Sequence, residues 1–211
     1  MNLQLTAATL LLLATVGYAG AAPGDETPSW LQQAASLKVP TYDKQVSAVV
    51  LVDDSTVTID PDGRVNEVYN FAVRILQKEG RDYAAGGVSY VPDTSKVKDF
   101  RAWVIRSNGE VKRYGKGETM DIADAPNDVY DEYRVKTITA KNEAEIGSVF
   151  GYTYTREDRS VFSQANWFFQ NEIPVVSSRY TLILPAGWRA EAITFNHANV
   201  EPRVNGSTYS W

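Results

Sequence analysis

The sequence predicts an all-β fold, an antiparallel β-sandwich of about ten or more strands with one short N-terminal helix. Three observations lead to this prediction. Apolar and polar residues alternate with period two in several segments, as in strands with one buried face. Turn residues separate these segments. Only one window, residues 29–36, has a helix-forming composition.

The single helix is expected close to the start of the folded part of the chain. Ser29 precedes Trp30 and a run of good helix formers, so we expect Ser29 to cap the helix. The helix should end before Val39-Pro40, because proline restricts the residue in front of it to extended conformations. We expect Trp30 to pin this N-terminal segment to the core.

The first strands follow from two patterns. Residues 46–52 form an apolar, β-branched run, and residues 55–60 alternate in polarity. Asp60-Pro61-Asp62-Gly63 is a strong turn signal. Beyond it, apolar residues occupy odd positions from Val65 to Ile75, which predicts a long half-buried strand.

The later strands are predicted from the same two signals, alternation and turns. Ser107–Glu110 indicates a hairpin turn. The acidic residues 118–132 are broken by Pro126 and predict at most one turn of helix. The expected strands are residues 97–106, 110–114, 150–154, 180–184, 188–195 and, after an Asn205-Gly206 turn, 207–211.

The first residues are typical of a secretory signal peptide. Residues 1–19 carry no ionised side chain, and the apolar run Leu10–Val16 is too short to span a membrane. Small residues place the cleavage after Ala19 or Ala21. Residues 20–28 are expected to form a linker. The sequence therefore predicts an exported protein, periplasmic or secreted.

Composition excludes several classes of function. The chain has 21 Lys and Arg against 26 Asp and Glu, a net charge of −5, and no basic stripe that would bind nucleic acid. It contains no cysteine and one histidine, which excludes disulfide scaffolds, thiolate metal sites and a cysteine nucleophile. We therefore expect no cofactor, no bound metal and no enzymatic activity.

Two features could carry chemistry, and each also has a plain structural interpretation. His197 could act as a general base, but no G-x-S-x-G nucleophile motif accompanies it, so a loop histidine is expected. The acidic stretch could bind calcium, although the usual calcium-loop pattern is absent and a solvated loop is expected. Its carboxylates are Glu118, Asp121, Asp124, Asp128, Asp131 and Glu132.

Aromatic residues provide the candidate interface. The chain has five Trp, twelve Tyr and seven Phe. Neighbours on a strand point to opposite faces, so at least one ring of Trp167-Phe168-Phe169 should face outward. Together with Trp103, these residues are the predicted contact surface. A purely structural core, a sugar-binding platform and an open sheet edge that accepts a partner segment remain alternatives.

Several blocks together resemble the DUF3857 domain, an all-β domain found in front of transglutaminase-like domains in exported bacterial proteins. The resemblance extends over residues 29–211. The matching blocks are Ser29-Trp30, Ala48–Asp54, Asp62–Arg64, Val73–Leu76 with Glu79-Gly80, Trp103-Val104, Asn108–Glu110, Tyr130–Val135, Gly147–Tyr154, Trp167–Gln170, Ile173–Val175 and Leu184–Trp188.

The resemblance implies a non-catalytic accessory domain at the front of a longer chain. The chain stops on Trp211 just after a strand has begun, which also suggests a continuation. The partner would be a downstream transglutaminase-like domain or a cell-envelope protein, and any cysteine chemistry would lie beyond Trp211. The alternative is a self-standing periplasmic module that binds carbohydrate or peptide, without insertion into the membrane.

Overall fold

The computed structural model describes residues 26–124, 132–159 and 164–211. The predicted signal peptide, its cleavage sites and most of the predicted linker lie outside these residues. The described chain forms two β-sheets and one short α-helix, which confirms the predicted all-β class. No helix within the described ranges has the length and apolar character needed to cross a membrane.

The described residues contain eleven strands, one α-helix and one 3₁₀ helix. The helices are α1 (Ser29–Ser36) and η1 (Lys78–Tyr83). The strands are β1 (Ala48–Ile59), β2 (Val65–Ile75), β3 (Ala85–Tyr90), β4 (Ser95–Ile105), β5 (Val111–Tyr114), β6 (Met120–Ala123), β7 (Arg134–Thr139), β8 (Val149–Asp158), β9 (Ser178–Ile183), β10 (Arg203–Asn205) and β11 (Thr208–Ser210).

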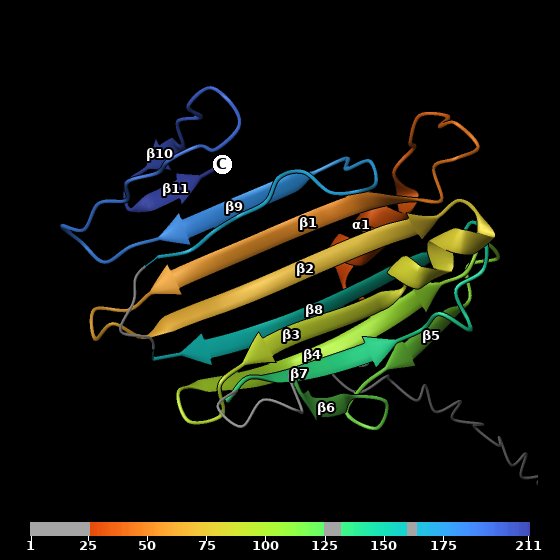
Figure 1. Cartoon of the computed structure of the whole chain (residues 1–211), viewed down its shortest axis with the longest axis horizontal. Coiled ribbons are helices and arrows are strands. Elements are labelled where there is room, and N and C mark those ends of the chain that lie inside the picture. Colours follow the sequence, from red (N-terminus) through yellow and green to blue (C-terminus); the bar gives the residue numbers. More distant parts are fainter. Residues whose placement is uncertain (1–25, 125–131, 160–163) are drawn as a thin grey trace, which may run out of the picture.

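The two sheets differ in size, and the smaller covers only part of the larger. The large sheet has the order β10-β11-β9-β1-β2-β8-β4-β5, and the small sheet has the order β3-β7-β6. Figure 1 shows the small sheet over the half that contains β8, β4 and β5, with α1 on the opposite face. The face formed by β2, β1 and β9 therefore has no second sheet above it.

One strand pair departs from the predicted antiparallel arrangement. Strand β9 runs parallel to β1, with Ser55 opposite Tyr180, whereas all other pairs are antiparallel in the described part of the chain. A parallel pair needs a long crossover connection. Residues 174–177 approach along the same edge, where Val50 N–H donates to Pro174 and Val176 N–H donates to Val50.

Each half of the core uses alternate residues of the same strands. Val50 and Phe150 point between the two sheets, where Ile138 of β7 packs on them. Val49 and Leu51 point to the other face, beneath α1. These side chains are fully buried, and each such burial contributes roughly 1.5–3 kcal/mol.

Helix α1 is held by the sheet and not by the predicted cap. Pro28 occupies the N-cap position without a side-chain hydrogen bond, so the prediction of a Ser29 cap is wrong. At the other end, the Arg74 guanidinium donates to the carbonyls of Ala35 (2.7 Å) and Leu37 (2.9 Å). An added Cβ at Gly151 would lie 2.4 Å from a methyl carbon of Leu31, so this glycine lets the helix approach.

Most predicted turns are confirmed, and three segments differ from prediction. Gly63 and Gly109 have φ angles of 82° and 88°, a conformation that suits glycine in the predicted turns. Residues 188–195 form no strand, and part of the acidic stretch forms β6. Sequence analysis also missed η1, which follows β2 directly.

Candidate functional site

The uncovered face of the large sheet contains an open groove of about 470 Å³, which we call the tyrosine groove. One wall is the edge of β3 at Gly87, and the other is the segment of residues 164–167. Its floor is formed by side chains of β1, β2, β8 and β9, namely Val57, Glu67, Tyr69, Tyr154, Arg156 and Tyr180.

Strand register produces the aromatic floor. Tyr154, Tyr69, Ser55 and Tyr180 lie directly opposite one another on four neighbouring strands. The rings of Tyr154 and Tyr69 stack with centroids 5.1 Å apart. Trp167 bridges the gap that the small Ser55 leaves, with its centroid 6.3 Å from Tyr69 and 5.5 Å from Tyr180.

Polar groups beneath this floor are already paired with one another. Ser55 Oγ donates to Glu67 Oε1 (3.0 Å), and Glu67 Oε2 lies 2.9 Å from Arg156 Nη2. The Tyr69 hydroxyl donates to Asp53 Oδ1 (2.7 Å). The groove therefore presents its aromatic rings beside the polar side chains of Asp158, Gln164 and Asn166, which also line it.

Burial keeps the tyrosines of the floor neutral. It raises the pKa of Tyr69 and of Tyr154 far above the ordinary tyrosine value, and the neighbouring carboxylates add to the shift. Burial also raises the pKa of Asp53, although the hydrogen bond from Tyr69 opposes this. The groove therefore supplies no phenolate nucleophile at neutral pH.

The four predicted interface residues lie in three different environments. Trp167 is half-buried at the groove, where its indole N–H donates to Ser178 Oγ (3.0 Å). Phe168 is 78% exposed and Phe169 is 44% exposed. Trp103 is 3% exposed and packs in the core beneath α1, so its ring offers almost no surface.

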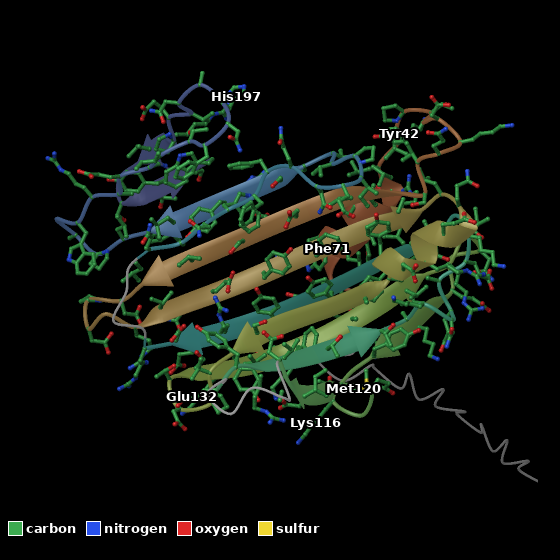
Figure 2. All side chains as sticks on the ribbon, in the orientation of Figure 1. Tyr42, Phe71, Lys116, Met120, Glu132 and His197 are labelled. Atoms are coloured by element: carbon green, nitrogen blue, oxygen red, sulfur yellow. The ribbon has the colours of Figure 1, made fainter. Side chains whose placement is uncertain are left out.

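The other candidate residues that the structure describes show no catalytic or metal-binding arrangement. His197 lies in an exposed loop away from the sheets, and its Nδ1 is 3.0 Å from the carbonyl of Ala198 (Figure 2).

Asp121 of the acidic stretch accepts a hydrogen bond from Tyr90 and pairs with Arg134 and Lys136. No cluster of three or more metal-ligating side chains occurs within residues 26–124, 132–159 and 164–211. Asp128 and Asp131 of the predicted calcium stretch lie outside the described residues.

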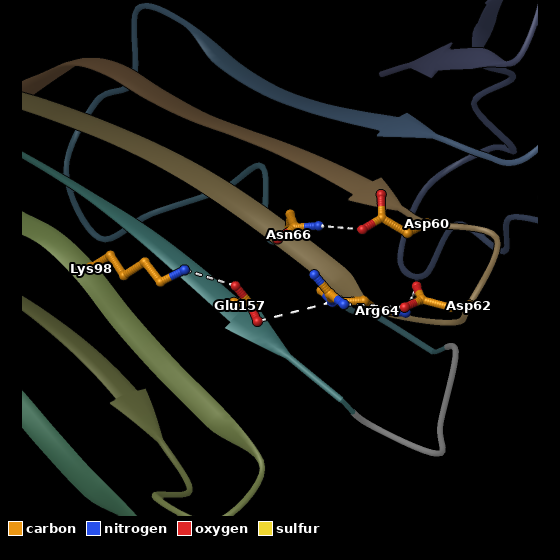
Figure 3. A network of polar contacts seen from close by, with 6 residues as sticks. All are labelled: Asp60, Asp62, Arg64, Asn66, Lys98 and Glu157. Atoms are coloured by element: carbon orange, nitrogen blue, oxygen red, sulfur yellow. Dashed lines mark hydrogen bonds and ion pairs between the residues drawn. The ribbon is translucent and has the colours of Figure 1, made fainter.

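A polar network at the strand ends has a structural role. Glu157 of β8 pairs with Lys98 of β4 (2.8 Å) and with Arg64 (3.9 Å) beside β2 (Figure 3). The hydrogen bond from Lys98 lowers the pKa of Glu157. These contacts join three neighbouring strands. Arg64 also lines an adjoining hollow of about 180 Å³, together with Asp62, Gly63 and Arg159.

Sequence analysis missed a second exposed surface, which we call the apolar loop. Five large apolar side chains between β9 and the end of β10 are 44–79% exposed. They are Trp188, Ile193, Phe195, Val200 and Val204. Three of them lie in residues 188–195, which were predicted to form a strand after a turn, but no strand forms there.

Comparison with known proteins places this fold inside a longer chain. The crystal structure of a "putative protease" from Parabacteroides distasonis ATCC 8503 superposes with a TM-score of 0.57 at 13% identity. The match covers 78% of this chain and 34% of that protein, so this chain spans about a third of its length. This likeness shows the fold alone. A comparison with curated protein sequences gives no match.

The family model called "Domain of Unknown Function with solved-structure structure (DUF3857)" matches residues 61–211. Helix α1 and all of β1 precede this range, yet they pack in the same core as the matched strands. Because the match extends over more than half of the chain, the protein belongs to the DUF3857 family.

Proposed function

We propose that this domain is a non-catalytic accessory domain of an exported transglutaminase-like protein, in which it docks on a catalytic domain or presents substrate to it. The apolar loop is the observation that carries the proposal. Soluble proteins seldom leave a cluster of large apolar side chains in water unless the cluster contacts a partner. The similar solved structure, in which this fold is about a third of a longer chain, supports such an arrangement.

The chemistry of the chain supports a non-catalytic role. A transglutaminase-like reaction needs a cysteine nucleophile activated by histidine, and this sequence has no cysteine. His197, the only histidine in the sequence, faces solvent and hydrogen-bonds to a neighbouring backbone carbonyl. In our proposal the nucleophile belongs to the domain that the apolar loop contacts. Export follows from the signal-like residues 1–19.

Photo-crosslinking in the native host tests the docking proposal. Benzoylphenylalanine at Phe195, which is 77% exposed, should crosslink to a domain that contains a cysteine and a histidine, in the same chain or in another protein. The matched control is Lys116, which is exposed on the opposite side of the molecule (Figure 2). Equal crosslinking patterns at the two positions would contradict the proposal.

The mass of the native protein separates this proposal from a self-standing module. An antibody against the domain should detect a species several times heavier than 23.4 kDa. A species at or below 23.4 kDa, together with no specific crosslink at Phe195, would instead mean that the chain works alone.

A further inference from the structure

Strand β3 has one edge that no described strand covers. Strand β7 pairs with its other edge, and β3 is the outer strand of the small sheet. In an antiparallel pair, the N–H and C=O of one residue point to the same side, and successive residues alternate. Ala140 N–H donates to Ala84 and Thr137 Oγ1 donates to Gly86. The backbone N–H and C=O groups of the even-numbered residues of β3 therefore point toward β7. Those of Gly87 and Ser89 point toward the tyrosine groove.

A contact from the floor confirms the direction of these groups. Arg156 Nη1 donates to the Ser89 carbonyl (3.1 Å), so the backbone groups of this odd-numbered residue point toward the groove. The Gly87 C=O and the Ser89 N–H belong to exposed residues and lie at the rim of the groove. An added strand can form backbone hydrogen bonds with such an acceptor and donor, because they lie on alternate residues of the edge strand.

The shape of the rim permits another backbone to approach. Gly87 has no side chain, and glycine on an edge strand often marks such an approach. An added strand would lie about 4.8 Å from β3, which places it above the groove floor. Its alternate side chains would point down onto Tyr69, Tyr154 and Trp167.

We propose that the tyrosine groove binds an extended polypeptide segment, which adds as a strand to the free edge of β3 and places apolar side chains on the aromatic floor. This inference rests on the proposed accessory function, because it assigns polypeptide as the substrate class that the domain presents. The groove and the apolar loop have no residue in common, so the two proposals can fail separately.

The arrangement of polar groups favours polypeptide over carbohydrate. A sugar platform needs side-chain donors and acceptors around its aromatic ring, because sugars bind largely through hydroxyl groups. Here Tyr69 donates to Asp53, and Glu67 pairs with Arg156 and Ser55. Gln164 and Asn166 also line the groove, on the segment opposite β3, whereas β3 presents backbone groups with the two-residue spacing of a strand.

The test begins with random dodecamer peptides displayed on phage and selected on the 211-residue chain. Ser89→Pro is the diagnostic variant, because it removes only an N–H that points away from β7, and proline is tolerated at such edge positions. Losing this hydrogen bond should weaken binding of the selected peptides by about tenfold or more. Ser89→Ala keeps the N–H and should bind like the wild type.

A second measurement does not depend on how the variant folds. Methylation of single backbone nitrogens in a selected peptide should weaken binding at alternate residues only, because every second N–H of an added strand faces β3. Phe195→Ser should leave peptide binding unchanged even if docking is lost. Failure to select any peptide, equal binding by Ser89→Pro, a flat methylation profile, or binding only of peptidoglycan glycan strands would each overturn the proposal.

Discussion

The two faces of the uncovered half of the large sheet are built from neighbouring residues of the same five strands, yet their chemistry is opposite. The row that faces the tyrosine groove is Tyr154, Tyr69, Ser55, Tyr180 and Trp211. One position away on each strand, the row on the other face is Thr155, Val68, Thr56, Thr181 and Ser210. The two residues of each pair are neighbours in the chain whose side chains leave the sheet on opposite faces.

The difference shows how period-two alternation assigns a role to each face. Four of the five side chains in the second row are Thr or Ser, whose hydroxyl groups can bond to water, and only Val68, 44% exposed, is apolar. The aromatic face carries large rings that are only partly covered by the small sheet and by Trp167. In our proposal the groove over these rings is the binding surface of this sheet.

The largest expected effect is on stability, and it compares Tyr154 with Thr155. Tyr154 is 8% exposed and stacks on Tyr69, so Tyr154→Ala should lower the free energy of unfolding by about 3–5 kcal/mol. Thr155→Ala, one residue along and on the other face, should change it by about 0.5 kcal/mol or less. Urea unfolding followed by tryptophan fluorescence measures both variants.

Similar losses of stability in Tyr154→Ala and Thr155→Ala would contradict this contrast between the two faces of the sheet. Equal losses would mean that both faces are buried in the native protein, for example beneath another domain. In that case the second face would be an interface in its own right, and the groove would no longer be the distinctive surface of this sheet.

A second prediction applies the same alternation to two neighbouring glycines of β3. A Cβ at Gly86 would lie 2.6 Å from a ring carbon of Tyr152, whereas a Cβ at Gly87 would make only ordinary contacts at 3.7 Å. Gly86→Ala should therefore destabilise by about 1–3 kcal/mol through overpacking. Gly87→Ala should have little effect on the melting temperature. Equal melting temperatures would show that Tyr152 moves aside without cost.

The strands were predictable because their signals are local. Alternation from Val65 to Ile75 and the Asp60–Gly63 turn need only neighbouring residues, and both appear as predicted. The parallel pairing of β9 with β1 was not predictable, because nothing local tells a strand which distant edge it joins. The strand predicted over residues 188–195 does not form. A local signal is not enough for a strand, because a strand also needs a neighbour to pair with.

The candidate site was only partly predictable. The aromatic content indicated a contact surface, and Trp167 does line the groove. Trp103 was also predicted to lie in this surface, but its ring is buried because α1 packs above it, which the residues around Trp103 do not encode. Tyr69, Tyr154 and Tyr180 come together only through the register of three strand pairs, so no single motif marks them.

The smallest expected effect concerns Asp53 and Asp54, which again leave β1 on opposite faces. Burial raises the pKa of Asp53 above the ordinary value of 3.8, so the folded state holds its proton more tightly than the unfolded chain does. As the pH rises above about 4, the Asp53 carboxyl loses its proton in the unfolded chain at a lower pH than in the folded protein. Ionisation of Asp53 therefore lowers the free energy of unfolding in this range of pH. Asp53→Asn retains an acceptor for Tyr69 and should gain stability relative to the wild type between about pH 4 and about pH 7.

Asp54→Asn is the matched control on the other face. Burial also raises the pKa of Asp54, but the Arg179 guanidinium, 4.0 Å from its carboxylate, opposes the shift. The asparagine variant loses that attraction and should gain less than Asp53→Asn over the same range of pH. Urea midpoints measured across this range decide the order. A larger gain for Asp54→Asn would mean that the second face excludes water more strongly than the tyrosine groove does, which would reverse the comparison.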